Sequence, residues 1–261
     1  MKKYLIFNLV LWLMFSCNMP KPPEKKVVRP KHNYIVLLDL SDRLIVQENQ
    51  PARDREIIDH IYQIFSEKVK NDLYIKSRDE FKVVIAPQRG DGLPTHVFED
   101  RLYYNIENMN LVERRKKEEE RYTHFVANLD TLYKEAVFSK NPKAYYGADI
   151  WKYFYEDLQT DYSSDTLTSN YLFILTDGYP IVGKDRSKLQ PIKNKYPDLQ
   201  VVLIEAAPRD KDMEWDRIMG LWTQWFEEIG VENYTMIKRK AISKEKEQLS
   251  DIVFNERPET I

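Results

Sequence analysis

Side chains with metal-binding and hydrogen-bonding chemistry follow two strongly apolar stretches of the chain. Asp39 and Ser41 come directly after the apolar run of residues 34–38, and Asp177 ends a second run, residues 171–176. Unbroken apolar runs of this length are typical of parallel strands that are buried on both faces. Open α/β sheets bind their ligands beyond the carboxyl ends of such strands, so we expect a binding site there. The alternative is that Asp39 and Ser41 only cap the next helix, because both residue types are good N-caps.

Predicted strands and predicted helices alternate along the chain. Predicted strands cover residues 34–38, 81–86, 171–176, 199–206 and 234–237. Helical spacing of apolar residues predicts helices over 51–70, 111–138, 149–158, 187–195, 213–229 and 243–253, with Gly230 as a C-cap. Such alternation predicts an α/β fold with a doubly wound, mostly parallel sheet and helices on both faces. We expect Trp215, Trp222 and Trp225, which share one predicted helix, to pack in its core.

Composition narrows the class of protein. The 261 residues are 43% hydrophobic, which is enough for one domain with a substantial core. The formal net charge is −2, so no overall basic field attracts nucleic acid. The chain also lacks a glycine-rich motif that would cradle phosphates.

The first residues have the pattern of a secretory signal. Two lysines precede an apolar run, and Ser16 stands just before the single cysteine, Cys17. The sequence Met14-Phe15-Ser16-Cys17 resembles a bacterial lipobox. The resemblance implies a lipid on Cys17 that anchors the protein to a membrane of the cell envelope, on either the periplasmic or the outer side. The domain organisation follows: signal peptide 1–16, Pro/Lys-rich tether 17–31, globular domain 32–254 and tail 255–261. The alternative is an uncleaved signal anchor.

The two polar strand ends resemble those of the von Willebrand factor type A (vWA) domain. The resemblance rests on Asp39-Leu40-Ser41 and Thr176-Asp177-Gly178 and covers about residues 34–253. In that family an Asp-x-Ser-x-Ser turn, a threonine from a second loop and an aspartate after the central strand form a metal-ion-dependent adhesion site. The ion, usually Mg²⁺, helps to bind an acidic group of a protein partner, and hard cations of this kind prefer oxygen ligands.

Carried over to this chain, the resemblance implies a metal site for Mg²⁺, or for Mn²⁺ or Ca²⁺. Its ligands would be Asp39, Ser41 and Asp177, with Asp149 and Asp42 as substitutes for missing hydroxyls. Two positions depart from the family pattern, because Arg43 replaces the second serine and Ala148 replaces the threonine. Carboxylates at close range need a positive partner. That partner is either a metal ion or the Arg43 guanidinium, acting as an internal counter-ion.

The function expected from these residues is binding rather than catalysis. No Ser-His-Asp spacing and no HExxH motif is present. A haloacid dehalogenase-type phosphatase would need an aspartate where Ser41 stands. We therefore expect a membrane-anchored lipoprotein with a vWA-like domain that binds a protein partner. The alternatives are a metal-dependent hydrolase that uses the same carboxylates and a structural component of an envelope assembly.

Overall fold

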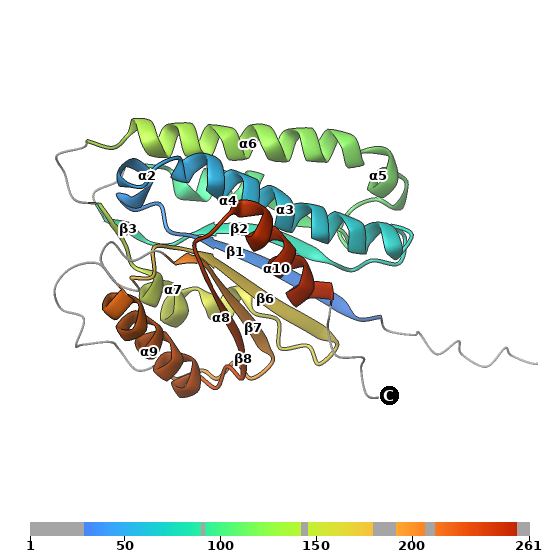
Figure 1. Cartoon of the computed structure of the whole chain (residues 1–261). Helices are drawn as coiled ribbons and strands as arrows, with labels where there is room; N and C mark the ends of the chain where they lie inside the picture. The colour runs from blue at the N-terminus through green and yellow to red at the C-terminus, as the bar shows by residue number, and fades with distance from the viewer. Residues whose placement is uncertain (1–28, 90–91, 142–145, 180–191, 207–211, 255–261) are drawn as a thin grey trace, which may run out of the picture.

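A six-stranded sheet forms the centre of the protein (Figure 1). The computed structural model describes residues 29–89, 92–141, 146–179, 192–206 and 212–254. The strand order is β4-β2-β1-β6-β7-β8, and every neighbouring pair is parallel except β2 with β4. The strands are β1 (Lys31–Leu38), β2 (Glu80–Ile85), β4 (Tyr103–Asn105), β6 (Thr168–Leu175), β7 (Leu199–Ala206) and β8 (Asn233–Lys238). Two short strands, β3 (Gln88–Arg89) and β5 (Gly147–Ala148), pair separately.

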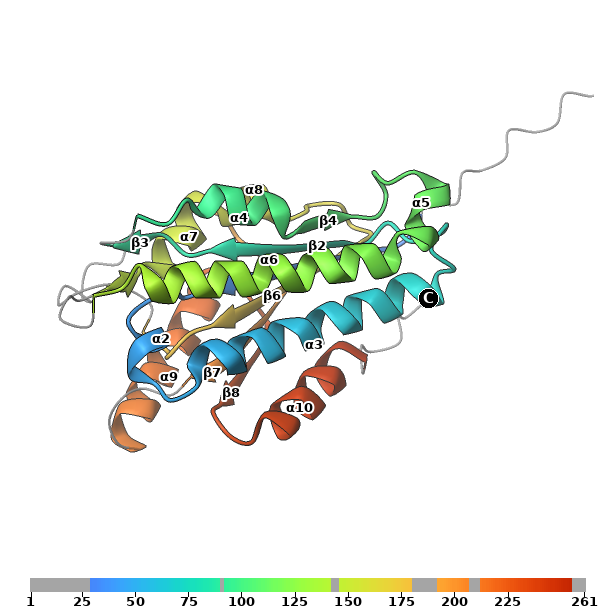
Figure 2. The same cartoon turned by 90° about the horizontal axis from the view of Figure 1, so that it is seen from above.

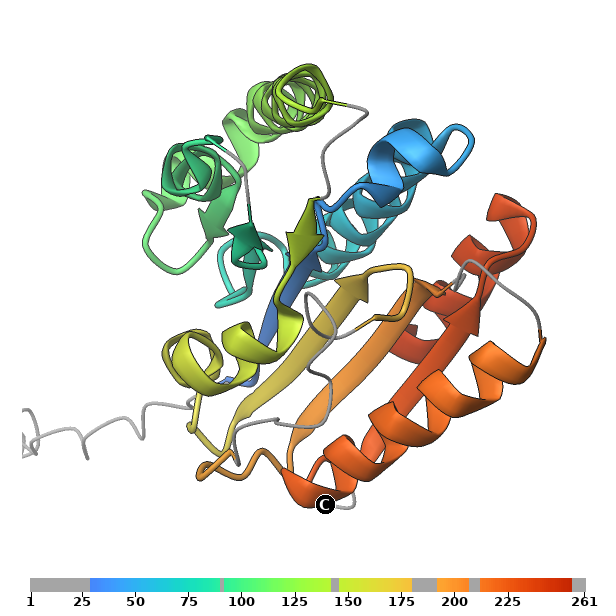
Figure 3. The same ribbon diagram turned by 90° about the vertical axis from the view of Figure 1, so that its left-hand side faces the viewer.

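Helices cover both faces of this sheet (Figures 1 and 3). One face packs against α2 (Arg43–Val46), α3 (Gln50–Asn71), α4 (Thr95–Arg101), α6 (Glu118–Phe138) and α10 (Ile242–Phe254). The other face packs against α7 (Ile150–Glu156), α8 (Leu158–Asp161) and α9 (Asp212–Glu228). A short helix, α5 (Leu111–Lys116), precedes α6. The predicted fold class, a doubly wound α/β sheet with helices on both faces, is confirmed.

The central strand β1 shows why its sequence is apolar without alternation. Tyr34 and Val36 belong to the core on the α3 side, whereas Ile35 and Leu37 belong to the core on the α9 side. Successive side chains of a strand point to opposite faces, so a strand covered on both faces needs apolar residues at every position. The Tyr34 ring also stacks on Tyr171 of β6, with ring centroids 5.2 Å apart.

The α9 side holds the predicted tryptophan cluster. Trp222 and Trp225 are buried, which confirms their core role, whereas Trp215 is only partly buried. The Trp225 ring lies 3.9 Å from the ring of Trp151, centroid to centroid. Gly230 follows α9 with a φ of 73°, which confirms it as the glycine that ends the helix.

The long helices and core strands were predicted within a few residues, and the short elements were missed. The predicted helix 111–138 is two helices that change direction at Lys117, and the predicted helix 149–158 is likewise interrupted at Asp157. Elements of two to seven residues, such as β3, β4, β5, α2 and α4, are too short to show a period. β1 begins one residue inside the predicted tether.

Several predictions fall outside the described residues. They concern the signal peptide, Cys17, most of the tether, the C-terminal tail and most of the predicted helix 187–195; its described residues 192–195 are not helical. Among the residues that are described, no helix is long and apolar enough to cross a bilayer.

Candidate functional site

Three loops meet at the carboxyl ends of the parallel strands, the side of the molecule that Figure 3 faces. They are residues 39–43 after β1, 146–149 before α7 and 176–178 after β6, and we call them together the carboxyl edge. The backbone N–H of Asp42 donates to the carbonyl of Tyr146 at 3.3 Å. The hydroxyl of Thr176 donates to Oδ2 of Asp39 at 2.9 Å. The structure therefore brings the sequence-predicted residues Asp39 and Ser41, Asp149, and Asp177 to one edge.

The Asp39 carboxylate is engaged inside its own turn. Its Oδ1 accepts the backbone N–H of Ser41 at 2.9 Å, and its Oδ2 accepts the Thr176 hydroxyl. Both Asp39 and Ser41 are buried. The residue at the N-cap of α2 is Asp42, whose side chain makes no capping hydrogen bond. Asp39 thus holds two strand ends together instead of capping the next helix.

Arg43 lies completely buried below this turn. Its Nε donates to the carbonyl of Asp39 at 2.8 Å, and its Nη1 and Nη2 donate to the two carboxylate oxygens of Asp54 at 3.2 and 2.6 Å. Its Nη2 also lies 3.3 Å from the carbonyl of Leu175. The Asp39 carboxylate is farther away, with Oδ2 4.0 Å from Nε. The main counter-ion of Arg43 is therefore Asp54, a residue that was not among the sequence candidates.

Asp54 is itself fully buried and fully hydrogen-bonded. It accepts hydrogen bonds from Nε2 of Gln50 at 2.7 Å and from the hydroxyl of Tyr133 at 3.0 Å, besides the two from Arg43. Burial by itself lowers the pKa of Arg43, but the carboxylates of Asp54 and Asp39 outweigh it and raise that pKa above its ordinary value. Arg43 thus stays charged.

A signal for Asp54 exists in the sequence. Asp54 stands three, four and seven residues before Ile57, Ile58 and Ile61, which are all buried against the sheet. A carboxylate in the apolar stripe of a helix must face the core, where it needs a positive partner. Thr176 had no such signal, because a threonine at a strand end is common.

The other two predicted ligands hold the neighbouring loops in place. Asp149 is the N-cap of α7, and its Oδ1 accepts the backbone N–H of Lys152 at 2.8 Å. Burial raises the pKa of Asp149, while that hydrogen bond opposes the rise. Asp177 is buried, and its Oδ1 accepts the N–H of Tyr179 at 3.2 Å.

The turn after Asp177 is fixed by α9. Gly178 has a φ of 102°, and its carbonyl accepts Nε1–H of Trp222 at 2.8 Å. A Cβ at this position would lie 3.2 Å from Cγ2 of Ile218. Glycine is needed here both for its φ and for this close approach.

The described residues of the carboxyl edge do not form a ready-made site for a divalent cation. The described residues contain no group of three or more His, Cys, Asp or Glu side chains that could hold a metal ion. Asp39 has two donors already, and Ala148 brings no hydroxyl to the edge. Metal binding by Asp39, Ser41, Asp177 and Asp149 stays a prediction from the sequence.

A second ionic cluster adjoins Gln50 and lies next to the carboxyl edge. Glu205, buried in β7 with a φ of 62°, accepts Nε–H of Arg53 at 2.7 Å. Nη2 of Arg53 also lies 2.9 Å from Oε2 of Glu245 in α10, whose Oε1 accepts the N–H of Lys240 at 2.5 Å. Arg239 Nη1 lies 3.5 Å from the other oxygen of Glu205. This cluster joins α3, β7, β8 and α10.

Burial and the neighbouring Glu205 carboxylate together raise the pKa of Glu245 to about 7, against the lowering effect of the Lys240 N–H. Burial by itself raises the pKa of Glu205, but the hydrogen bonds with Arg53 and Glu245 and the charges of Arg53 and Arg239 together outweigh it and lower that pKa. The pKa values of the two neighbouring carboxyl groups are therefore shifted in opposite directions, so Glu245 is the one that takes up a proton first as pH falls.

Comparisons with known proteins found no matching family model, no matching curated protein and no matching solved structure. The resemblance to the vWA domain therefore rests on the residues quoted above. The α/β fold is compatible with it.

We expect the Arg43–Asp54 pair to behave as one unit in stability measurements. Arg43→Met leaves a buried carboxylate without its cation, which should cost about 3–5 kcal/mol. Combining it with Asp54→Leu should recover part of that loss, with a coupling energy of about 2–3 kcal/mol in a urea-denaturation cycle. A double variant whose loss equals the sum of the two single losses would show that the pair is not coupled.

The raised pKa of Glu245 predicts a pH dependence with a definite sign. A carboxyl group whose pKa is higher in the folded than in the unfolded protein stabilises the fold at low pH and loses that effect as pH rises through the folded value. Wild type should therefore lose stability relative to Glu245→Gln between about pH 5 and pH 8, because glutamine cannot ionise. Thermal melting of both proteins across this range measures the difference, and two parallel curves would contradict the assignment.

The hydrogen bonds that already engage Asp39 at the carboxyl edge also predict the outcome of a metal titration. We expect neither saturable heat nor a shift in melting temperature when Mg²⁺ or Mn²⁺ is added to millimolar concentration. Saturable binding in calorimetry that disappears in Asp177→Ala would instead establish the metal site expected from the sequence.

Proposed function

We propose that this chain is a non-catalytic binding protein of a bacterial cell envelope, attached through Cys17, that engages a protein partner at the carboxyl edge. The observation that carries the proposal is the charge balance of that edge. Its three loops contain Asp39, Asp42, Asp149 and Asp177, and their single basic residue, Arg43, is paired with Asp54 in the interior. Asp39 and Asp177 are buried, so the side chains of these loops that reach solvent are Asp42 and Asp149. Both are acidic, which favours a partner that presents basic side chains.

The hydrogen bonds that the individual side chains already make support binding over catalysis. Both carboxylate oxygens of Asp39 and Oδ1 of Asp149 accept hydrogen bonds from N–H and hydroxyl groups that shape the loops. A general base needs a carboxylate or imidazole that can reach a substrate proton, and the buried Asp39, with both oxygens already engaged, does not offer one. Loops that are rigidly held on a sheet form a preorganised surface, which lowers the entropic cost of association.

The attachment to a membrane is supported by the sequence alone. It rests on the lipobox-like Met14-Phe15-Ser16-Cys17 and on the Pro/Lys-rich residues that follow it. A tethered domain meets a partner in the same envelope at a raised effective concentration. Even a modest affinity at the carboxyl edge would then be sufficient.

Site-specific photo-crosslinking of the full chain in cells tests the partner surface. A photoreactive amino acid at Val46, exposed on α2 beside the carboxyl edge, should give a discrete crosslinked species. The same group at Val126, which is exposed on α6, serves as the control position. Asp42→Asn combined with Asp149→Asn should weaken the crosslink, since it removes two charges while asparagine retains the capping ability of aspartate.

The same experiment has two outcomes against the proposal. Equal crosslinking from Val46 and Val126 would indicate an assembly role through the helical surfaces. A crosslink from Val46 that is unchanged in the double variant would show that the acidic edge does not select the partner.

A further inference from the structure

Exposed apolar side chains gather at the end of the molecule opposite the carboxyl edge. Leu73 and Ile75, in the turn after α3, are each 63% exposed, and Leu111 and Val112, in the first turn of α5, are 56% and 61% exposed. We call these four residues the amino-end patch. In Figures 1 and 2 the end of α3 and α5 lie together at the right of the molecule, where β1 also begins. Isolated exposed apolar residues are ordinary, but four on adjoining segments are not.

The two segments of the patch are fastened together by one buried arginine. Nη1 of Arg114 donates to the carbonyls of Tyr74, Ile75 and Ser77 at 3.2, 3.1 and 3.1 Å. Its Nη2 donates to the carbonyl of Glu107 at 2.9 Å. The patch is thus a fixed surface and does not consist of independent loose ends.

The backbone at Leu73 is strained, and the Leu73 side chain lies outside the core. The N–H groups of Leu73 and Tyr74 close the end of α3 on the carbonyls of Lys70 and Val69, at 2.8 and 2.9 Å. This helix ending usually takes glycine, yet Leu73 and Tyr74 have φ values of 54° and 58°. Conformations of this kind cost about 1–2 kcal/mol for a residue with a side chain. An exposed leucine at such a position does not contribute to the core, which favours a role in contact with a partner.

Basic residues surround the patch. Lys76, Arg115 and Lys116 are exposed and make no ion pair with the described residues. Residues 68–78 and 107–117 together hold eight Lys or Arg against three Asp or Glu. Acidic residues 118–120 follow on α6, and the first of them is neutralised by Lys70 at 2.8 Å. Apolar side chains flanked by lysine and arginine match a bilayer interface with anionic head groups.

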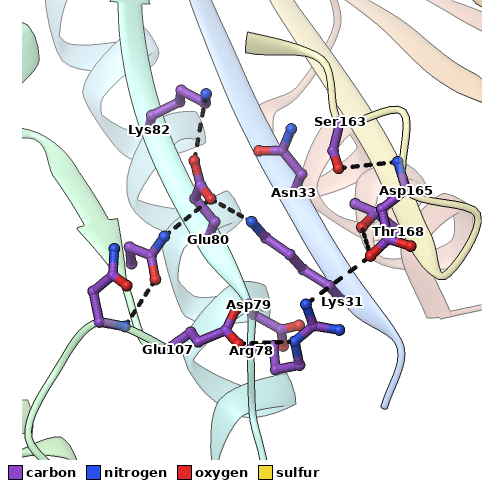
Figure 4. A network of polar contacts seen from close by, with 12 residues as sticks. Lys31, Asn33, Arg78, Asp79, Glu80, Lys82, Glu107, Ser163, Asp165 and Thr168 are labelled. Atoms are coloured by element: carbon purple, nitrogen blue, oxygen red, sulfur yellow. Dashed lines mark hydrogen bonds and ion pairs between the residues drawn. The ribbon is translucent and has the colours of Figure 1, made fainter. Parts of the chain in front are cut away.

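The chain also enters the domain at this end. Nη1 of Arg78 donates to the carbonyl of Arg29 at 2.9 Å. Nε of the same arginine pairs with Glu107 at 3.2 Å, as Figure 4 shows. Arg29 thus lies beside the segment that carries the patch. The twelve residues from Asn18 to Arg29 can span at most roughly 40 Å. A lipid on Cys17 would therefore keep the amino-end patch within that distance of the bilayer.

We propose that the amino-end patch is a membrane-contact surface that docks on an anionic bilayer and turns the carboxyl edge away from it. The proposal rests on the attachment near Cys17 only for its local concentration. The patch adds an orientation that a flexible tether alone does not provide.

An environment-sensitive fluorophore on the full chain tests this docking. In a Cys17→Ser background, a single cysteine replaces either Leu111 or Val46; both are 56% exposed, at opposite ends of the molecule. Vesicles of phosphatidylcholine with 30% phosphatidylglycerol should blue-shift the label at position 111 and protect it from an aqueous quencher. The label at position 46 should stay in water.

Charge and apolar variants identify the contact. Replacing Lys76, Arg115 and Lys116 by glutamine should weaken vesicle binding about five-fold for each charge removed. Replacing Lys134, Lys240 and Lys244, which are exposed elsewhere, should leave it unchanged. Leu73→Asn should also weaken binding while the helix end is kept, because asparagine tolerates a positive φ.

Three outcomes would overturn the proposal. The first is a chain that sediments with vesicles while the label at 111 stays as wet as the label at 46, which would place the vesicle contact outside the patch. Because Cys17 is replaced in these variants, that result would not bear on attachment through a lipid. The second is equal burial of both labels. The third is a label at 111 that responds to an envelope protein extract but not to lipid, since the surface would then bind protein.

Discussion

The ion pair between Arg43 and Asp54 is the constraint on which the carboxyl edge depends. Both side chains are fully buried, and they join the turn after β1 to α3, with Tyr133 of α6 as a third member. A buried charge that loses its partner is very costly, so alternative packings of these segments are strongly disfavoured. Buried ion pairs in general add little net stability compared with apolar residues of similar size. We infer that the main effect of this pair is to select one arrangement of the loops.

That arrangement determines the chemistry of the edge. Because Arg43 is paired with Asp54 in the interior, the side chains of the three loops that reach solvent, Asp42 and Asp149, are both acidic. Asp39 and Thr176 close the gap between β1 and β6 with a direct hydrogen bond. These contacts fix the loops, and the acidic side chains that they carry are the basis of the binding function that we propose.

The two ends of the sheet differ in character because the central strands are parallel. Their carboxyl ends all point to the acidic edge, while their amino ends lie near the turn of residues 72–78 and the point where the chain enters the domain. The second ionic cluster, around Arg53, fastens α10 and β8 to the same core near the acidic end. The two ends of the domain therefore differ in surface character: one carries basic and apolar side chains, and the other carries acidic ones.

The sequence alone determined the architecture. Apolar runs such as residues 34–38 can be satisfied only where both faces of a strand are covered, and helical spacing then supplies the covering layers, so the order of the long elements follows from local patterns. It also placed Asp39, Ser41, Asp149 and Asp177 at one edge. Tertiary structure alone decided which of them interact. Asp54 meets Arg43 across 11 residues of chain, and Thr176 meets Asp39 across 137. Arg114 of α5 contacts Tyr74, in the turn after α3, across 40 residues. Such contacts depend on how helices and strands pack. The local pattern around Asp54 indicates a buried carboxylate, but it does not identify the partner.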